Sequence, residues 1–455
     1  MEKRARESWS GRAGFVLATI GSAVGIGSIW KFPYELGANG GSAFLLAYLA
    51  GLVLIVIPLM LAEFAIGRRG RGDPVTAFEV VARESGASRR WGLAGLLGVL
   101  CGVLILSFYA VIGGWTIAQA VDVLRHGLPG AQPDAARARF AAFLADPVQM
   151  LCFHAIFVAS CTAIVMRGIG GGIETAVKLL MPVLAVLMVG LVAYSLAYGD
   201  VGTTLRFLFA FDVSKLTART VVEALGLGLF SIGVGMGLMI TYAGYARLEV
   251  SLLQVALISV AADTAISLLA GFAVFPIVFA HGLDPGSGPA LVFETLPLAF
   301  SNMPLGAPAA VAFHLLLFIA ALASAISSLE LAVAWLIRKG FGRRAATVGV
   351  ALVCFAGGIP TVLSFNLWAQ WHPLAAIPVF ERATFFDLID ELTSNLMLPI
   401  GGLAIAVFAG WAMDPDRLAA ELRLSPPGAA LLRFTIRFVV PVGIVLAGLA
   451  PWMMR

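Results

Sequence analysis

Residues 14–41, GFVLATIGSAVGIGSIWKFPYELGANGG, form an apolar segment that is interrupted near its middle by Gly21, Gly25 and Gly27. Residues 225–246, LGLGLFSIGVGMGLMITYAGYA, repeat this pattern with a second set of three, Gly233, Gly235 and Gly237. Within a helix interior, each glycine costs about 1 kcal/mol relative to alanine. A single cluster is commonly explained by close packing of membrane helices through small residues. Two clusters in corresponding segments indicate two helices that are broken.

Apolar segments long enough to cross a bilayer recur along the whole chain. Of its 455 residues, 60% are hydrophobic and 12% are charged, whereas a typical soluble domain is about 45–50% apolar and about 25% charged. One span needs roughly 20 residues, and we predict eleven spans, at residues 12–36, 42–67, 92–124, 148–167, 176–198, 220–246, 251–280, 308–338, 344–363, 383–412 and 430–453. The chain is therefore predicted to be an all-α polytopic membrane protein, which excludes an ordinary soluble domain.

Positive charges are distributed unevenly between the two sets of connections. Lys and Arg crowd the N-terminal tail and the connections around residues 68–90 and 338–344, whereas the long connection at 281–307 carries neither. By the positive-inside rule, the N-terminus is predicted to be cytoplasmic and, with an odd number of spans, the C-terminus external. The expected location is the inner (plasma) membrane, with the lipid bilayer as partner. A net charge of +4 gives no reason to expect nucleic acid.

The two broken segments are the first and sixth spans, five spans apart. Because an odd number of spans inverts the second copy, residues 12–198 and 199–412 are predicted to form an inverted pair of five spans each. Residues 1–11 would be a cytoplasmic tail, and 413–455 a cytoplasmic loop followed by the eleventh span. Helices broken near the midplane are typical of transporters, because freed carbonyls bind cations and freed amides bind an anion. A zwitterion accompanied by small cations is the expected cargo.

Several motifs resemble those of the neurotransmitter:sodium symporter family, in particular its bacterial amino-acid transporters. WSGRAGFVLATIGSAVGIGSIWKFPY, ANGGSAFLLAY and IPLMLAEFAIGRRGR resemble its first two helices, SFYAVIGGW its third and GMGLMITYAGY its sixth. RGIGGGIE, IAALASAISSLE and FFDLIDELTSN extend the resemblance over residues 1–412. The resemblance implies a secondary symporter with about eleven transmembrane helices, of which the first and sixth are broken at the midplane.

The resemblance implies two sodium sites built from oxygen atoms. The first would use the carbonyl of Ala23, the side chains of Ser28, Ser231 and Asp263, and the carboxylate of the substrate. The second would use the carbonyls of Gly21, Val24 and Ala320 and the hydroxyl of Ser324. Ala323 stands where relatives carry a further hydroxyl, so water replaces that ligand or the site is weaker. Hard oxygen ligands suit an alkali cation, and neither chloride nor an organic cofactor is expected.

An amino-acid site between the two broken helices is also implied. Backbone amides near Ile26 and Gly27 and the phenol of Tyr109 would hold the carboxylate, and carbonyls of the broken helices, including those of Ala23 and Phe230, the ammonium group. The remaining lining residues would be Ile105, Ser231, Gly233, Met236, Ser324 and Ser328. Gly233 and Ser328 replace larger residues of some relatives, which predicts a roomy pocket and a bulky apolar or aromatic substrate.

Two gates follow from the same resemblance. Lys31 and Asp390 correspond to an outer charged pair, and Arg6 with Trp9 to an inner gate that lies near Tyr245. The acidic partner expected for Arg6 is missing, because Arg338 occupies its place. Inner closure is therefore expected to depend on other contacts or to be looser.

Together these features predict sodium-coupled import of a hydrophobic or aromatic L-amino acid by alternating access, without chloride. Leu227 stands where chloride-dependent relatives carry a glutamine, and Asp263 would supply the missing negative charge. Two alternatives stay open, namely transport of another small amino-acid-like solute and a sensor that binds an amino acid without transporting it. An enzyme is disfavoured because HExxH, GxxxxGK and GxSxG motifs are absent, and a channel because no filter-like sequence repeats. The sequence leaves the oligomeric state open.

Overall fold

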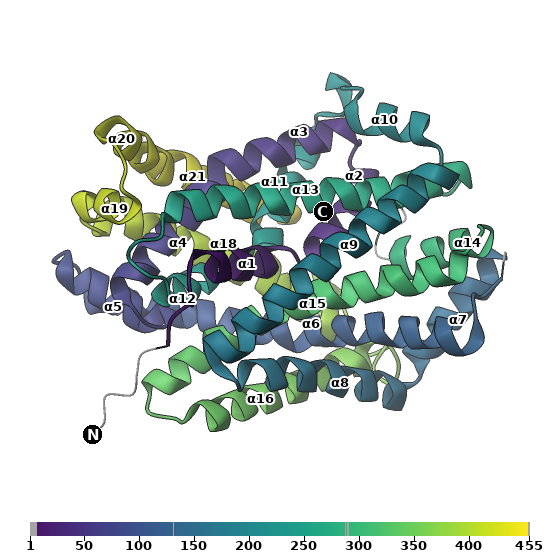
Figure 1. Ribbon diagram of the computed structural model, residues 1–455, viewed down its shortest axis with the longest axis horizontal. Coiled ribbons are helices and arrows are strands. Elements are labelled where there is room, and N and C mark those ends of the chain that lie inside the picture. Colours follow the sequence, from purple (N-terminus) through teal and green to yellow (C-terminus); the bar gives the residue numbers. More distant parts are fainter. Residues whose placement is uncertain (1–6, 131, 287, 289–290, 454–455) are drawn as a thin grey trace.

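The protein is built from helices. The computed structural model describes residues 7–453 with the exception of 131, 287, 289 and 290, and every regular element in this part of the chain is a helix. Figure 1 shows that the long helices lie roughly along one common direction, the long axis of the molecule. The predicted all-α class is confirmed.

In the first part of the chain, short turns of wider or tighter helix extend several α-helices. The α-helices are α1 (Arg12–Ala23), α2 (Phe32–Ala38), α3 (Ser42–Gly51), α4 (Ile57–Gly70), α5 (Pro74–Glu84), α6 (Gly92–His126), α7 (Pro133–Ala145), α8 (Pro147–Val165) and α9 (Thr175–Tyr198). The π-helical turns are Gly27–Lys31, Leu52–Val56 and Ile169–Glu174, and Arg89–Trp91 is a 3₁₀ turn.

The second part of the chain follows the same plan. Its α-helices are α10 (Val201–Phe209), α11 (Ala218–Ile232), α12 (Leu238–Gly244), α13 (Leu252–Ala280), α14 (Leu296–Ser301), α15 (Gly306–Arg338), α16 (Arg343–Ser364), α17 (Phe385–Asp390), α18 (Leu398–Val407), α19 (Pro415–Leu422), α20 (Pro426–Phe434) and α21 (Val440–Met453). The π-helical turns are Leu291–Thr295, Glu391–Met397, Phe408–Ala412 and Thr435–Val439, and the 3₁₀ turns are Val213–Lys215 and Pro378–Phe380.

Nine helices among the described residues are long and apolar enough to cross a membrane, and a tenth span is the pair Arg12–Ala23 and Gly27–Ala38, bent by 51°. The predicted sixth span is present as α11 and α12, of 15 and 7 residues, on either side of residues 233–237. Neither piece reaches the roughly 20 residues that a span requires. Each predicted span thus corresponds to a helical segment, while the count of eleven membrane crossings stays a prediction.

Small residues let the central helices approach closely. A side chain at Gly67 of α4 would meet the backbone of Ile240 in α12, and one at Gly98 of α6 would meet the backbone of Met236. Membrane helices associate mainly through such close packing. These contacts hold the interrupted sixth segment against two intact helices, which fixes its position in the centre of the bundle.

The two ends of the bundle differ in charge. Arg68 and Arg69 lie in the last turn of α4, Arg338 ends α15, and Arg343 begins α16. We call this end the arginine-rich end. It lies on the left of Figure 1 with α5, α19 and α20, whereas α7, α10 and α14 lie at the opposite end on the right.

Candidate ion and substrate site

The first broken helix opens its backbone at residues 24–26. α1 ends at Ala23, and Val24 leaves the helical conformation with φ −76° and ψ 99°. A side chain at Gly25 would lie 3.0 Å from the hydroxyl of Tyr109 and 3.1 Å from Cβ of Ser324, so α6 and α15 close around this point. Peptide groups freed within a membrane need partners from the protein or from its cargo.

The second break is shaped by glycines and held by a buried carboxylate. Gly233, Gly235 and Gly237 have φ of +70°, +103° and +84°, a conformation that glycine adopts without steric cost. The carboxylate of Glu63, from α4, accepts hydrogen bonds from the amides of Gly235 at 2.6 Å and Met239 at 3.2 Å. Glu63 was not among the site residues predicted from the sequence. An acidic residue inside an apolar span was the signal that could have identified it.

Replacing Glu63 is expected to weaken both folding and transport. In Glu63→Ala the two amides lose their acceptor, and each unpaired buried group costs roughly 1–3 kcal/mol. We expect a lower melting temperature and an uptake rate reduced by about tenfold, with Glu63→Gln intermediate because it keeps one amide oxygen as acceptor. Thermal melting and uptake on the same preparations check this. Wild-type rates in the alanine variant would show that the carboxylate does not hold the break.

Four oxygen-bearing residues converge beside the first break. The hydroxyl of Ser28 contacts Oδ1 of Asp263, lies 2.9 Å from the hydroxyl of Ser231 and donates to the Ala23 carbonyl at 3.5 Å. The Tyr48 hydroxyl donates to Oδ2 of Asp263 at 3.3 Å. Asp263 is fully buried. The structure therefore brings together all four residues of the first predicted sodium set, and a carboxylate with hydroxyl and carbonyl oxygens is a donor set suited to a hard cation.

The second predicted sodium set lies where α1 packs against α15. Its members are Gly21, Val24, Ala320 and Ser324, and the side chain of Ser324 is close to the first break. A side chain at Gly21 would lie 3.5 Å from Cβ of Ala323, so the two helices touch at this level. Ser327 donates a hydrogen bond to the Ser324 carbonyl at 2.5 Å. Ala323 contributes only a methyl group here, so this set has a single side-chain hydroxyl.

A small cavity lies between the broken helices, with a volume of about 30 Å³. It is lined by Ser22, Gly25, Gly27, Ile105, Tyr109, Phe230, Ser231, Gly233, Met236, Leu238, Ser324 and Ser328. Of the predicted substrate residues, Ala23 and Ile26 are outside this lining, although the Ile26 amide donates to the Tyr109 hydroxyl at 3.2 Å.

The prediction of a roomy pocket is wrong for this conformation. A side chain at Gly233 would lie 3.1 Å from Cδ1 of Leu238 and 3.7 Å from Cε of Met236. Gly233 has no side chain, and the side chains of Leu238 and Met236 fill the space beside it. The remaining space holds only a few water-sized molecules, so an amino acid enters only if these side chains move.

A larger cavity of about 450 Å³ adjoins the small one and shares Tyr109 and Phe230 with it. Lys31 and Asp390 both line this larger cavity, yet no salt bridge within 4.0 Å joins them in the described part of the chain. The Lys31 ammonium instead lies 4.8 Å from the ring centroid of Phe230. The predicted outer pair thus lines an open approach to the small cavity.

At the arginine-rich end, Trp9 closes the approach from the other side. Its side chain is buried, and its indole N–H donates to the carbonyl of Tyr242 at 2.9 Å. The Trp9 amide donates to the Tyr245 carbonyl at 3.3 Å. Trp9 and Tyr245 therefore meet as predicted from their positions, whereas Arg6, the other predicted inner-gate residue, lies outside the described residues.

A buried acid that was not predicted from the sequence, Glu330, completes this end. Glu330, two turns before Arg338 on α15, accepts from the Tyr245 hydroxyl at 2.7 Å and from Arg343 at 2.7 Å. Arg343 also pairs with Glu7 at 2.5 Å. The inner end was expected to close through contacts other than an acid at position 338. The contacts of Glu330 with Tyr245 and Arg343 are of this kind. Arg338 itself lies 3.9 Å from Asp73.

Comparison with known proteins identifies the family. A family model described as the sodium:neurotransmitter symporter family matches residues 6–138 and 147–369. The chain belongs to this family. Among curated relatives, the uncharacterized sodium-dependent transporter YhdH of Bacillus subtilis is 34% identical over 452 residues, covering 98% of both chains. An uncharacterized sodium-dependent transporter of Haemophilus influenzae is 32% identical over 447 residues, covering 96% of both.

A solved structure agrees with this sodium:neurotransmitter symporter assignment. The crystal structure of MhsT in complex with L-phenylalanine matches with a TM-score of 0.89 and 39% sequence identity, over 98% of this chain and 100% of that one. The family and its named relatives are transporters, which confirms the predicted class and the prediction that the protein is not an enzyme.

Proposed function

We propose that the protein imports a hydrophobic or aromatic L-amino acid together with sodium ions, by alternating access and without chloride. The observation that carries this proposal is the meeting of Ala23, Ser28, Ser231 and Asp263 beside a helix break. That donor set adjoins a cavity lined by both broken segments. The likeness to MhsT, which was solved with L-phenylalanine, supports the substrate class.

Two sodium ions are proposed. The first would take the place now filled by hydrogen bonds among Ser28, Ser231 and Asp263, with the Ala23 carbonyl as a further ligand. The second would bind Gly21, Val24, Ala320 and Ser324. Because Ala323 supplies no hydroxyl, water would complete the second site. A fully buried carboxylate is stabilised in its charged form by a nearby cation, which supports the first site more strongly than the second.

The proposed amino acid would span the small cavity. Its carboxylate would bind the amides of Ile26 and Gly27 and the hydroxyl of Tyr109, and its ammonium group the carbonyls of Ala23 and Phe230. Its side chain would displace Met236 and Leu238 and lie among the remaining lining residues. Met236 adapts readily to a new shape because its side chain is unbranched.

In the proposed alternating access, the site is open either to the side of the 450 Å³ cavity or to the arginine-rich end, and never to both at once. Sodium would favour the arrangement in which the 450 Å³ cavity reaches Tyr109 and Phe230. Substrate would then draw Lys31 and Asp390 together, and the contacts around Trp9 and Glu330 would open. We assign the arginine-rich end to the cytoplasm and the protein to the plasma membrane, because positive charge marks the cytoplasmic side.

The proposed topology keeps the predicted division of the chain. Residues 12–198 and 199–412 would form two inverted repeats, preceded by the tail 1–11. Residues 413–455 would form a cytoplasmic loop and a last span that ends outside. This arrangement would place the breaks of the first and sixth spans at the same depth, as their joint lining of one cavity suggests.

Uptake of a panel of amino acids by proteoliposomes tests the substrate class, and Ser328→Ile sharpens the test. Ser328 is buried in the cavity lining, and overpacking costs about 1–3 kcal/mol. We expect wild type to prefer phenylalanine, tryptophan and leucine, and Ser328→Ile to weaken tryptophan uptake at least about fivefold more than alanine uptake. Binding of amino acids without uptake would instead favour the sensor alternative.

Ser328→Ala is the matched control, because it removes the hydroxyl without adding volume. Equal losses for tryptophan and alanine in the isoleucine variant would show that Ser328 does not line the side-chain pocket. Gly233→Ser is a poorer probe: with φ of +70°, any side chain there strains the backbone and would weaken all substrates alike.

A further inference from the structure

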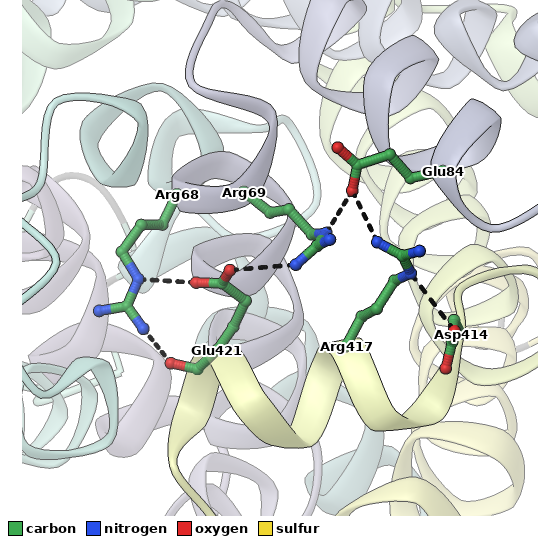
Figure 2. A network of polar contacts seen from close by, with 6 residues as sticks. All are labelled: Arg68, Arg69, Glu84, Asp414, Arg417 and Glu421. Atoms are coloured by element: carbon green, nitrogen blue, oxygen red, sulfur yellow. Dashed lines mark hydrogen bonds and ion pairs between the residues drawn. The ribbon is translucent and has the colours of Figure 1, made fainter.

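Helix α19, in the connection that follows the tenth predicted span, is tied to α4 and α5 by charged side chains. Figure 2 shows these residues from close by, and Figure 1 places α19 at the arginine-rich end. We call them the α19 network: Arg68, Arg69, Glu84, Asp414, Arg417 and Glu421. None of them belongs to the ion and substrate site described above.

Glu421 is the best-buried acid of the α19 network. One of its carboxylate oxygens accepts from Nε of Arg68 at 2.9 Å, and the other from Nη1 of Arg69 at 3.5 Å. A second guanidinium nitrogen of Arg68 donates to the Glu421 backbone carbonyl. The side chains of Arg68 and Glu421 are only 3% and 15% exposed. For a pair so far removed from water, loss of one partner is costly because the other charge is left buried.

The second part of the α19 network is closer to solvent. Glu84 pairs with Arg69 at 2.5 Å and with Arg417 at 3.1 Å, and Arg417 lies 3.3 Å from Asp414. The exposures of these side chains run from 23% to 40%. Ion pairs at such positions contribute little because solvent screens them. Within the α19 network, the buried pair between Arg68 and Glu421 is therefore the one whose loss is expected to cost the most free energy.

Arg68 links Glu421 to the chain segment beside Trp9. Its Nη1 donates to the carbonyl of Val250 at 2.7 Å, in the connection between α12 and α13. Arg423, which directly follows α19, donates to the carbonyl of Leu248 at 2.7 Å. Two side chains therefore attach α19 and α4 to the connection at residues 245–251.

The same connection holds Trp9 in place. Arg247 donates from Nε to the Trp9 carbonyl at 3.2 Å, and the Tyr245 carbonyl accepts from the Trp9 amide at 3.3 Å. A continuous set of hydrogen bonds thus runs from Glu421 through Arg68 to the connection 245–251 and on to Trp9. Two of these hydrogen bonds hold Trp9 directly, and those of Arg68 hold the connection that carries them.

We infer that Glu421 is a positioning residue for transport: through Arg68 it holds residues 245–251 against Trp9 and so stabilises the conformation that is closed at the cytoplasmic end. The inference rests on the proposed alternating access. Contacts made only in the closed conformation bias the equilibrium toward it, in proportion to their differential stability. Neutralising Glu421 therefore shifts the population toward the conformation that is open to the cytoplasm.

Cysteine labelling at two positions measures this shift. Ala334→Cys reports on a cavity of about 400 Å³ at the arginine-rich end, which Tyr245 also lines. Ile112→Cys reports on the 450 Å³ cavity at the opposite side of the site. Both native residues are buried. The one exposed native cysteine, Cys152, is replaced by alanine throughout, because the other three are buried. Labelling rates are compared without sodium in wild type, Glu421→Gln and a control. The control is Asp416→Asn, an exposed acid of α19 whose carboxylate forms no ion pair among the described residues.

With Glu421→Gln, labelling of Ala334→Cys is expected to rise about tenfold while labelling of Ile112→Cys falls, because the lost ion pair is inferred to stabilise the conformation that is closed at the cytoplasmic end. Glu421→Asp, which keeps the charge on a shorter side chain, gives a smaller shift in the same direction and serves if the glutamine variant does not fold. General loosening would raise both rates together, and this result would contradict the inference. So would rates in Glu421→Gln that equal those in Asp416→Asn.

The proposed function is tested separately in the same experiment. Sodium is expected to lower the labelling of Ala334→Cys in wild type, because it favours the outward-open state. Absence of that response would contradict alternating access driven by sodium. The comparison between Glu421→Gln and Asp416→Asn is made without sodium, so it decides the role of Glu421 independently.

Discussion

Asp263→Asn is expected to lower the apparent sodium affinity of amino-acid uptake by about 100-fold in chloride-free medium, the effect of removing one partner from a buried charge pair. Asp263 is fully buried, and its two carboxylate oxygens contact Ser28 and Tyr48. These partners are neutral, so Asp263 is the one side chain of the proposed first sodium site that carries negative charge. Asparagine keeps the shape and one oxygen ligand but not the charge.

Chloride provides the control for this charge argument. Wild-type uptake should be the same in chloride and in gluconate, whereas chloride should restore part of the sodium affinity of Asp263→Asn. Tyr48→Phe is the matched variant, because it removes the hydrogen bond to Oδ2 while leaving the carboxylate in place, and it should cost much less. Full sodium affinity in Asp263→Asn without chloride, or loss of wild-type uptake in gluconate, would contradict the proposal that the carboxylate takes the place of chloride.

The sequence was sufficient to locate the broken helices and the residues around the first of them. Glycine clusters mark places where a regular helix is disfavoured, and the structure has breaks after Ala23 and at residues 233–237. Motif resemblance placed Ser28, Ser231 and Asp263 in one set, and they meet within hydrogen-bonding distance. These features could be predicted because the glycine clusters act on the local backbone, and because the resemblance compares residues at matching positions of a shared fold.

Features that depend on the packing of distant segments were missed. Glu63 binds the amide of Gly235, and Glu330 accepts a hydrogen bond from Tyr245. Both partners are far away in the sequence, so the residues next to Glu63 and Glu330 do not indicate these contacts. The pocket volume was missed for a different reason: Leu238 and Met236 are near Gly233 in the sequence, but the sequence does not show that their side chains lie beside it. The outer pair of Lys31 and Asp390 illustrates a third limit: a sequence indicates which residues can meet, whereas a single conformation contains only some of those contacts.

An inward sodium gradient is expected to drive accumulation of the amino acid inside proteoliposomes. If sodium and the amino acid move together, a tenfold inward sodium gradient can drive about tenfold accumulation for each coupled ion, since each factor of ten corresponds to about 1.4 kcal/mol. Two proposed sites would therefore support up to about 100-fold accumulation. Potassium should not substitute, because the oxygens of the proposed first site, around Ser28, Ser231 and Asp263, are closely spaced.

The most direct measurement starts with proteoliposomes that contain the same phenylalanine concentration inside and outside. An inward sodium gradient is then imposed, and the internal phenylalanine concentration is followed over time. Sodium-coupled transport predicts net accumulation above the external concentration, which disappears when a sodium ionophore collapses the gradient or when potassium replaces sodium. Equilibration that is unchanged by the direction, size or identity of the cation gradient would contradict the proposed symport.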